Sequence, residues 1–267
     1  MPEAAELPVL FVGCGDLGTG AAHALFGAGF PVAVVERPLP LAVRRRAAFA
    51  EAARSGVVEV EGVRCRRVAL AQLAPAAWPG DAIPLVTEPH EAVIRALVPA
   101  VVVDARLAKR KLQTAVPDSM FFVVLGPGCA AGRDCDAVIE TLRGPDLGRV
   151  IWEGGATADT GVPGKLGGVS VERVLRAPHT GSLRVRAGIG ARVRAGDVVA
   201  TVGGEPVCAA VDGVLRGMLA DGDRVAAGQK LGDVDPRPQP PPVDAISDKS
   251  RAVGRGVLEA VRTRFGL

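Results

Sequence analysis

Residues 9–18 read Val9-Leu10-Phe11-Val12-Gly13-Cys14-Gly15-Asp16-Leu17-Gly18, an apolar run that ends in a glycine-rich turn. A helical pattern follows to residue 28, and a second apolar run, residues 31–35, ends at Glu36. Gly13 permits the tight turn, Gly15 lets backbone approach a pyrophosphate, and Gly18 lets helix and strand pack closely. Glu36 stands where such units bind a ribose hydroxyl. The stretch therefore predicts a nucleotide-binding βαβ unit.

Asp16 is the one residue in this stretch that argues against a bound phosphate. It falls in the first turn of the predicted helix, where its carboxylate competes for the N–H groups that a phosphate needs. Two interpretations stay open as a result. Either the loop binds a dinucleotide, or its glycines only build the turn.

The first half of the chain alternates short apolar runs with helical ones. Strands are predicted at 9–12, 31–36, 57–60, 83–86, 100–104, 121–125 and 149–152, and helices at 17–28, 40–54, 90–97 and 136–143. Several of the strands are continuously apolar, as expected where helices cover both faces of a parallel sheet. Residues 1–153 are therefore predicted to form a Rossmann-like α/β domain with a doubly wound parallel sheet.

An internal repeat of 32 residues follows residue 153. Six positions recur in one register: Ala177, Gly181, Leu183, Gly190, Val193 and Gly196 match Ala209, Gly213, Leu215, Gly222, Val225 and Gly228. Residues 154–235 resemble the two interlocking halves of an all-β barrel-sandwich hybrid of the lipoyl/biotinyl type. In the swinging-arm carriers of that fold, a modified Lys sits between the halves, but residues 202–207 contain none. We therefore expect a docking or structural module without lipoate or biotin.

The last segment, residues 236–267, is predicted to be a Pro-rich linker followed by a helix. Residues 236–242 hold five prolines, which makes a semi-rigid spacer. Apolar residues share one face of a helix at about 250–264, and Ser247 or Asp248 can cap it. Such a face needs a partner, and we expect it to pack on the first domain.

Three further clusters are candidates for ligand binding. A second glycine-rich loop, with Gly126, Pro127 and Gly128, follows the strand at 121–125 and should meet the first loop at the carboxyl edge of the sheet. Arg44 and Arg45 follow Glu36 on the predicted helix 40–54, where they either reach an anion or form a solvated face. The last cluster follows the strand at 100–104 and comprises Asp104, Arg106 and Lys109. It is compatible with an oxyanion or nucleotide, and equally with an internal ion-pair network.

Composition excludes several classes of function. The net charge is only +3, aromatic residues make up 3% and Tyr is absent, which argues against a nucleic-acid partner. No apolar run is long enough for a membrane span, and the acidic start is unlike a signal peptide, so we expect a cytoplasmic protein without a membrane partner.

Cysteine and histidine patterns predict no metal site. The five cysteines form no Cys-x-x-Cys pair, and the three histidines lack metal-ligand spacing. Cys14, Cys129 and Cys135 lie in glycine-rich loops and would meet only if those loops converge. Buried thiols without such a role are the alternative.

Taken together, these motifs resemble the YqeB-like accessory proteins of selenium-dependent molybdenum hydroxylases. The resemblance spans nearly the whole chain and is carried by residues 13–20, 36–45, 103–109, 125–128, 138–141, 148–154 and 245–249. Cys129 departs from the Phe expected after Gly-Pro-Gly. The resemblance implies a role in maturing or inserting the molybdenum cofactor, with a molybdenum hydroxylase or its cofactor machinery as partner.

Three functions follow from the sequence. The first is an accessory protein whose α/β domain binds a nucleotide-bearing or oxyanionic ligand, either a dinucleotide or a molybdenum cofactor species. The second is an NAD(P)-dependent oxidoreductase, favoured by the first glycine loop and Glu36. The third is a structural adaptor that only docks the hydroxylase. No catalytic residue is assigned, and the oligomeric state is left open, self-association included.

Overall fold

A computed structural model describes residues 2–73, 80–109, 114–159, 161–162 and 164–267. The chain folds as two compact units, and each draws on separated segments of the sequence. The first unit takes in Met1–Pro40, Ala48–Asp159 and Ile246–Leu267, and the second takes in Leu41–Ala47 and Thr160–Ala245.

The first unit is an α/β structure. Its helices are α1 (Asp16–Gly27), α2 (Ala52–Ser55), α3 (His90–Leu97) and α4 (Asp248–Phe265), with 3-10 turns at η1 (Ala4–Glu6), η3 (Phe49–Glu51) and η4 (Leu70–Gln72). Its strands are β1 (Val9–Val12), β2 (Val32–Val35), β3 (Val57–Val60), β4 (Val63–Arg67), β5 (Ala82–Val86), β6 (Val101–Asp104), β7 (Phe121–Leu125), β8 (Ala130–Ala131), β9 (Ala137–Ile139), β10 (Val150–Ile151) and β11 (Gly154–Gly155).

Nine strands of the described residues form one mixed sheet in the order β10-β9-β7-β6-β1-β2-β5-β4-β3. Seven neighbouring strands run parallel, while β3 and β10 join the two edges antiparallel. The predicted α/β class is confirmed, but the expectation of a wholly parallel sheet is wrong at both edges. At the β3 edge the cause is local, because Glu61 and Gly62 both adopt positive φ and close a two-residue hairpin.

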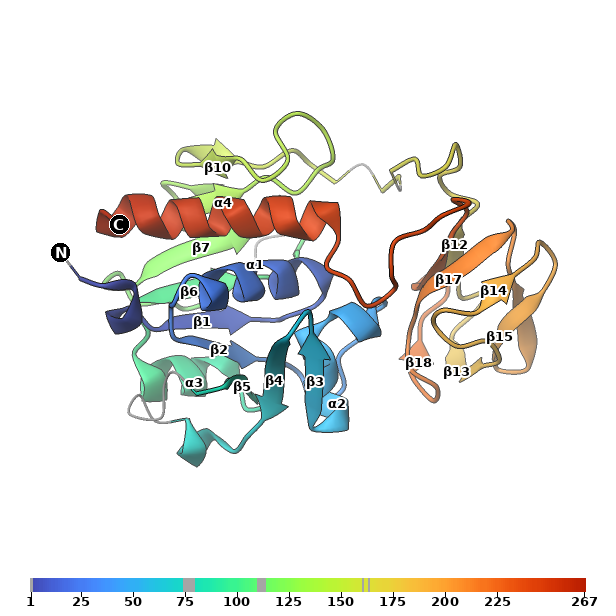
Figure 1. Ribbon diagram of the computed structural model, residues 1–267, viewed down its shortest axis with the longest axis horizontal. Helices are drawn as coiled ribbons and strands as arrows, with labels where there is room; N and C mark the ends of the chain where they lie inside the picture. Colours follow the sequence, from blue (N-terminus) through green and yellow to red (C-terminus); the bar gives the residue numbers. More distant parts are fainter. Residues whose placement is uncertain (1, 74–79, 110–113, 160, 163) are drawn as a thin grey trace. The chain divides into compact units, whose positions relative to one another are not determined.

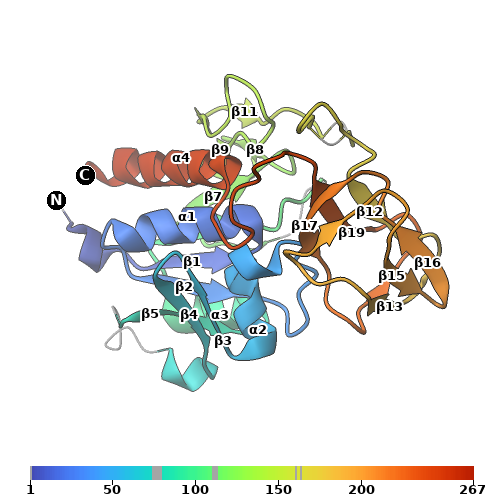
Figure 2. The ribbon, with the colours of Figure 1, turned by 45° about the vertical axis from the view of Figure 1, so that its right-hand side comes forward.

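Helices cover both faces of this sheet (Figure 1). Val9 and Phe11 pack with α1 and α4 on one face, while Leu10 and Val12 pack with α3 on the other. Figure 2 shows α1 and α4 side by side. The chain leaves β1 for β2 on one side and reaches β6 on the other, so the strand order reverses at β1. Open α/β sheets bind ligands at the carboxyl ends of strands beside such a reversal.

Two predicted helices are wrong. Residues 40–54 contain only the 3-10 turns η2 (Arg45–Ala47) and η3 and the short α2, because residues 41–47 bond elsewhere: the Val43 carbonyl accepts the Met218 N–H at 2.8 Å. Residues 136–143 begin instead with strand β9, parallel to β7 and fully buried. In both places tertiary pairing overrides local helical preference.

The predicted C-terminal helix is confirmed as α4. Ser247 caps it by accepting the Ser250 N–H at 3.0 Å. The helix packs on α1 through glycines: a Cβ built on Gly254 would lie 2.5 Å from the Gly20 carbonyl oxygen. The two backbones therefore approach each other more closely than any larger residue allows.

The second unit is built from short antiparallel strands. They are β12 (Val174–Arg176), β13 (Gly181–Val185), β14 (Arg192–Val193), β15 (Val198–Val202), β16 (Glu205–Cys208), β17 (Gly213–Met218), β18 (Arg224–Val225) and β19 (Lys230–Asp235). Within the described residues they form two four-stranded sheets, β12-β19-β17-β14 and β16-β15-β13-β18. Each sheet mixes strands from both copies of the 32-residue repeat.

The pairing between the two copies is reciprocal. Gly181 pairs with Val225, and its counterpart Gly213 pairs with Val193, the counterpart of Val225. The same exchange relates Leu183↔Val202 to Leu215↔Val234. The copies thus interlock about a pseudo-twofold axis, as the unbroken register of the repeat predicts.

Candidate functional site

The first hollow, of about 440 Å³, lies at the carboxyl ends of β1, β2 and β5. Its walls come from the turns that follow these strands and from the segment after β6. The lining residues are Val12, Gly13, Val35, Glu36, Arg37, Pro38, Thr87, Glu88, Pro89, His90 and Arg106. The structure therefore brings together predicted residues from three motifs: Gly13, Glu36 and Arg106.

The glycine loop has the geometry that its sequence predicts. Gly13 has φ +81°, a backbone conformation that residues other than glycine rarely adopt. A Cβ on Gly18 would lie 2.9 Å from the Ala105 Cβ, so Gly18 allows α1 to pack against the segment after β6. A Cβ on Gly15 would meet nothing within 4 Å. The loop is thus tight at its ends and open in the middle, where a ligand can approach.

Glu36 is oriented by the loop itself. One carboxylate oxygen accepts the Cys14 N–H at 3.0 Å, and the other accepts the Arg37 N–H at 2.8 Å. The carboxylate therefore lies directly beside the glycine loop at the end of β2. Each carboxylate oxygen has a second lone pair, so Glu36 can still accept a hydrogen bond from a ligand hydroxyl.

Asp104 and Arg106 form a clamp at the end of β6. Asp104 is buried, and its two oxygens accept from Arg106 Nε at 3.0 Å and from Nη2 at 2.5 Å. Arg106 also contacts the Thr114 hydroxyl. Burial alone would lower the pKa of Arg106, but the Asp104 carboxylate outweighs burial and raises it. The guanidinium thus remains charged and fixed beside the first hollow.

Asp16 is engaged by α4 rather than left facing the loop. Its Oδ1 accepts the Ser250 hydroxyl at 2.8 Å. Its position in the first turn of α1 is as predicted. Asp16 still places a negative charge in the first turn of α1, so an anion at the loop would be repelled by it and by Glu36.

The second glycine loop borders a second hollow, of about 190 Å³. It is lined by Leu17, Leu107, Lys109, Pro127, Thr141, Leu142, Thr157, Asp159 and Lys249. Gly126 and Gly128 are not among the lining residues. Gly128 packs against the segment after β6, since a Cβ on it would lie 2.6 Å from the Ala108 carbonyl oxygen. The segment 104–109 bounds both hollows, since Arg106 lines the first and Lys109 the second.

Glu140 ties the walls of the second hollow together. It is 3% exposed, and its oxygens accept the N–H groups of Thr141, Leu142 and Thr157 at 2.7, 2.7 and 2.8 Å. Burial would raise the pKa of Glu140, but these hydrogen bonds outweigh burial and lower it. The carboxylate is ionised at neutral pH and holds two chain segments at one point.

Arg44 and Arg45 are not at either hollow. Both belong to the second unit. Arg44 Nη2 donates to the Ala245 carbonyl at 2.8 Å, and Arg45 Nε donates to the Met218 carbonyl at 3.1 Å. Since the predicted helix does not form there, these side chains serve backbone acceptors of their own unit.

Sequence reasoning missed several residues that line the hollows. Glu88 and His90 follow β5 as Glu36 follows β2, so their place after a buried strand was a usable signal. Lys249 lines the second hollow from the first turn of α4, far along the chain from the other lining residues. Its signals in the sequence were its place two residues after the capping Ser247 and its membership of the segment 245–249 that carries the family resemblance.

A curated relative matches almost the whole chain. The chain is 42% identical over 253 residues, 95% of its length, to the uncharacterized protein YqeB of Escherichia coli (strain K12). The sequence is therefore similar to that of YqeB over nearly its whole length. It spans about half of that relative, 47% of its length. No family model matches the chain.

Solved structures give this YqeB-like chain only weak likenesses. An aspartoacylase family protein of Mesorhizobium loti aligns over 88% of this chain and 87% of that one, with 11% identity and a TM-score of 0.28. The product-bound ectoine utilization protein EutE of Ruegeria pomeroyi aligns over 32% and 27%, with 19% identity and a TM-score of 0.22. At these scores neither likeness supports an argument about the YqeB-like chain.

The three loop cysteines do not come together at one point. Cys14 is buried in the core on the α1 face of the sheet, whereas Cys129 and Cys135 pack against the core on the opposite face. The soft-ligand cluster considered from the sequence is therefore wrong. Across the described ranges, no three His, Cys, Asp or Glu side chains are placed to hold a metal ion.

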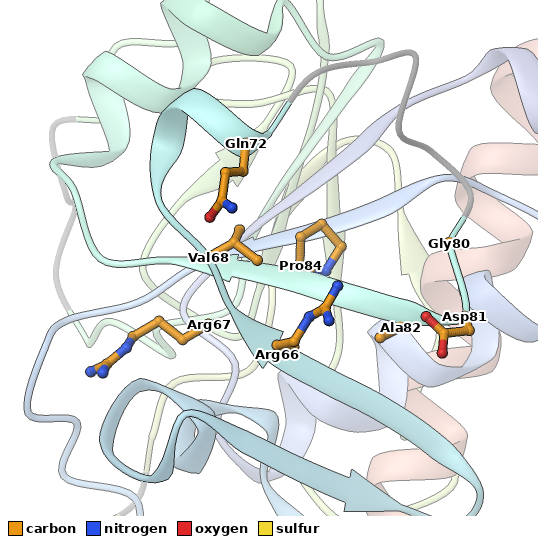
Figure 3. A pocket seen from close by; sticks show the side chains of 8 residues that line it. All are labelled: Arg66, Arg67, Val68, Gln72, Gly80, Asp81, Ala82 and Pro84. Atoms are coloured by element: carbon orange, nitrogen blue, oxygen red, sulfur yellow. The ribbon is translucent and has the colours of Figure 1, made fainter.

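A third hollow of the YqeB-like chain, of about 330 Å³, lies beside β4 and β5 (Figure 3). Arg66 and Arg67 line it, but none of the predicted site residues does. Its other lining residues are Val68, Gln72, Gly80, Asp81, Ala82 and Pro84. None of the helices in the described part of the chain has the length and apolar character needed to cross a membrane.

Proposed function

We propose that this chain is an accessory protein in the maturation of a selenium-dependent molybdenum hydroxylase. Its α/β unit, Rossmann-like in the order of its central strands, binds a nucleotide-bearing or oxyanionic ligand. The molybdenum cofactor or a precursor is the cargo, and the hydroxylase or its cofactor machinery is the partner. The YqeB-like sequence supports the family part of this proposal.

One observation carries the ligand-binding part: the first hollow unites Gly13, Glu36 and Arg106 at the reversal of strand order. At about 440 Å³ it falls within the usual range for small-molecule pockets, roughly 300 to 1,000 Å³. It offers a hydrogen-bond acceptor at Glu36 and, at Arg106, a guanidinium that is fixed by Asp104 and keeps further N–H groups for a ligand. That combination suits a ligand with both hydroxyl and anionic groups.

The β unit is proposed to be a barrel-sandwich hybrid that docks the partner. Its two sheets and reciprocal pairing support this fold. The hairpin between the halves turns at Gly203 and Gly204, both with positive φ, and bears no lysine. A lipoyl or biotinyl mass increment on the purified protein would refute this assignment.

The decisive experiment is mass spectrometry of the ligands released from natively purified protein, followed by binding measurements on Gly15→Val. Gly15 has φ −68°, so valine is tolerated by the backbone, and no neighbouring atom opposes the side chain. The methyl groups of the valine would occupy the open space next to Gly15, where a ligand would approach the loop. We expect the copurified ligand to be lost with an unchanged melting temperature.

Gly27→Val is the matched control for this experiment. Gly27 ends α1, and a Cβ there also meets nothing within 4 Å. It should retain the ligand. Equal ligand content in both variants would show that the first loop is only a turn.

An NAD(P)-dependent oxidoreductase is the second candidate, and the position of Glu36 favours it. Glu36 ends β2 inside the first hollow, where a ribose hydroxyl of a dinucleotide would lie. Calorimetric titration with NAD and NADP separates this candidate from the first. A protein that binds neither, and releases no ligand, would instead be the structural adaptor.

A further inference from the structure

The second hollow contains a lysine whose charge is not neutralised by a contact. Lys249 lies in the first turn of α4 and lines the hollow. Its ammonium makes no hydrogen bond or ion pair with any residue in the described ranges. The chain has only five lysines against a total of 32 lysines and arginines, yet two of the five line this hollow.

The neighbouring charged residues have partners of two kinds. The carboxylates of Glu140 and Asp16 accept hydrogen bonds from backbone N–H groups and from the Ser250 hydroxyl, respectively, and the other charges form ion pairs. Lys109 Nζ lies 2.5 Å from Asp159 Oδ2. Arg143 holds Asp248 through two hydrogen bonds of 2.7 and 2.9 Å. Among the charged residues that line the hollow, Lys109 and Asp159 pair with each other, so the Lys249 ammonium is the lining charge that an anionic occupant can contact directly.

A neutral donor completes the polar side of the hollow. The Thr141 side chain lines it, and its hydroxyl makes no hydrogen bond with the described residues. The Glu140 carboxylate fixes the Thr141 backbone by accepting its N–H at 2.7 Å. A rigid hydroxyl beside an ammonium is a preorganised pair of donors for an oxyanion.

The electrostatics of Lys249 agree with an incomplete site. Desolvation lowers the pKa of Lys249, and the guanidinium of Arg143 lowers it further, while Asp16, Asp159 and Glu140 act in the opposite direction. A bound anion next to the ammonium would favour the charged form and raise this pKa.

The volume of the hollow indicates the size of the group that it can surround. About 190 Å³ is below the range of pockets that hold whole cofactors or nucleotides. It is sufficient for one tetrahedral group, which can be a phosphate group of a larger molecule or a free metal oxyanion such as molybdate.

We infer that the second hollow is an oxyanion-binding site in which Lys249 supplies the charge and Thr141 a hydroxyl. This site is separate from the first hollow, where the proposed function places its ligand. The two assignments therefore stand or fall independently.

The test uses the full chain with isotope-labelled lysine. Five lysine side-chain signals are expected, and the Lys249 signal is assigned by its loss in Lys249→Arg. Inorganic phosphate, molybdate and AMP are titrated separately. At least one of them should shift the Lys249 signal saturably and raise its pKa, and the tightest binder identifies the source of the oxyanion.

Lys249→Gln should raise the dissociation constant of that probe by about tenfold or more, because a hydrogen bond to a charged group contributes at least a factor of about ten in affinity. Lys249→Arg should retain part of the affinity. Lys165→Gln, which removes the same charge from an exposed position of the second unit, should not change it. The inference is overturned if no probe shifts the Lys249 signal saturably. It is also overturned if Lys249→Gln binds the probe no more weakly than Lys165→Gln does.

Discussion

Replacing Glu140 by alanine tests the claim that one buried carboxylate holds the second hollow together. Its oxygens accept three backbone N–H groups, all within 2.8 Å. Thr141 is buried, whereas Leu142 and Thr157 are exposed enough for water to replace the lost acceptor. The cost therefore comes mainly from the Thr141 N–H.

The magnitude follows from that difference in burial. A buried donor left unpaired costs about 1–3 kcal/mol, and each exposed hydrogen bond contributes about 0.5–1.5 kcal/mol. Glu140→Ala should thus lower the free energy of unfolding of the α/β unit by about 3 kcal/mol. Glu140→Gln keeps the shape but loses the charge, and since charge-assisted hydrogen bonds are about twice as strong as neutral ones, it should cost at least half as much.

Urea unfolding followed by tryptophan fluorescence measures the free energy of unfolding of the α/β unit. Both tryptophans, Trp78 and Trp152, belong to the segment 48–159 of the α/β unit. Glu259→Ala is the control, because Glu259 is an exposed carboxylate of α4 and should change stability by less than about 0.5 kcal/mol. A Glu140→Ala cost no larger than that of the control would refute the reasoning.

The same variants have a pH dependence of known sign. The pKa of Glu140 is lowered in the folded state, so its carboxylate contributes fully above its unfolded value of about 4.3. That contribution is lost as the pH falls through the lower folded value. The difference between wild type and Glu140→Gln should therefore be constant near neutral pH and shrink below about pH 4.

Three further outcomes are expected. Gly254→Ala places a methyl group against α1 backbone and should destabilise the α/β unit by about 2 kcal/mol in urea, whereas Gly27→Ala, with open space around it, should be neutral or stabilising. If the ligand is a dinucleotide, Glu36 should make NAD bind more tightly than NADP in calorimetry, since a carboxylate accepts from a 2′-hydroxyl and repels a 2′-phosphate; tighter NADP binding would contradict this. In alkylation at pH 8, exposed Cys208 should react before Cys135, whose pKa is raised to about 12 chiefly by burial, and peptide mass mapping checks the order.

Continuously apolar runs could be predicted as strands, whereas a strand in which charged residues alternate with apolar ones could not. The run 121–125 is apolar throughout and was found. Strand β4 alternates exposed arginines around the buried Cys65, and its composition hides it. Residues 136–143 contain local helix formers, but Ala137 pairs with Val123 of β7, 14 residues upstream, and no pattern within the segment itself records that pairing.

The candidate site shows the same division. Gly13 and Glu36 were predictable because their spacing on one βαβ unit encodes their geometry. Lys249 lies more than one hundred residues from Thr141 and meets it only through the packing of α4. Arg44 and Arg45 were placed at the wrong element, because hydrogen bonds to distant carbonyls of their own unit, not helix propensity, decide where they lie.

The interruption of the α/β unit by the β unit has a consequence for synthesis of the chain. Val253, Val257 and Val261 of α4 are fully buried in the α/β core, yet they follow the segment 160–245. At typical translation rates, those roughly 90 residues delay α4 by on the order of 10 s. During this interval the ribosome displays an unfinished sheet with one helix missing from its surface, whereas the β unit can fold as soon as it emerges. The nascent α/β unit is thus the part of the chain that needs protection from aggregation.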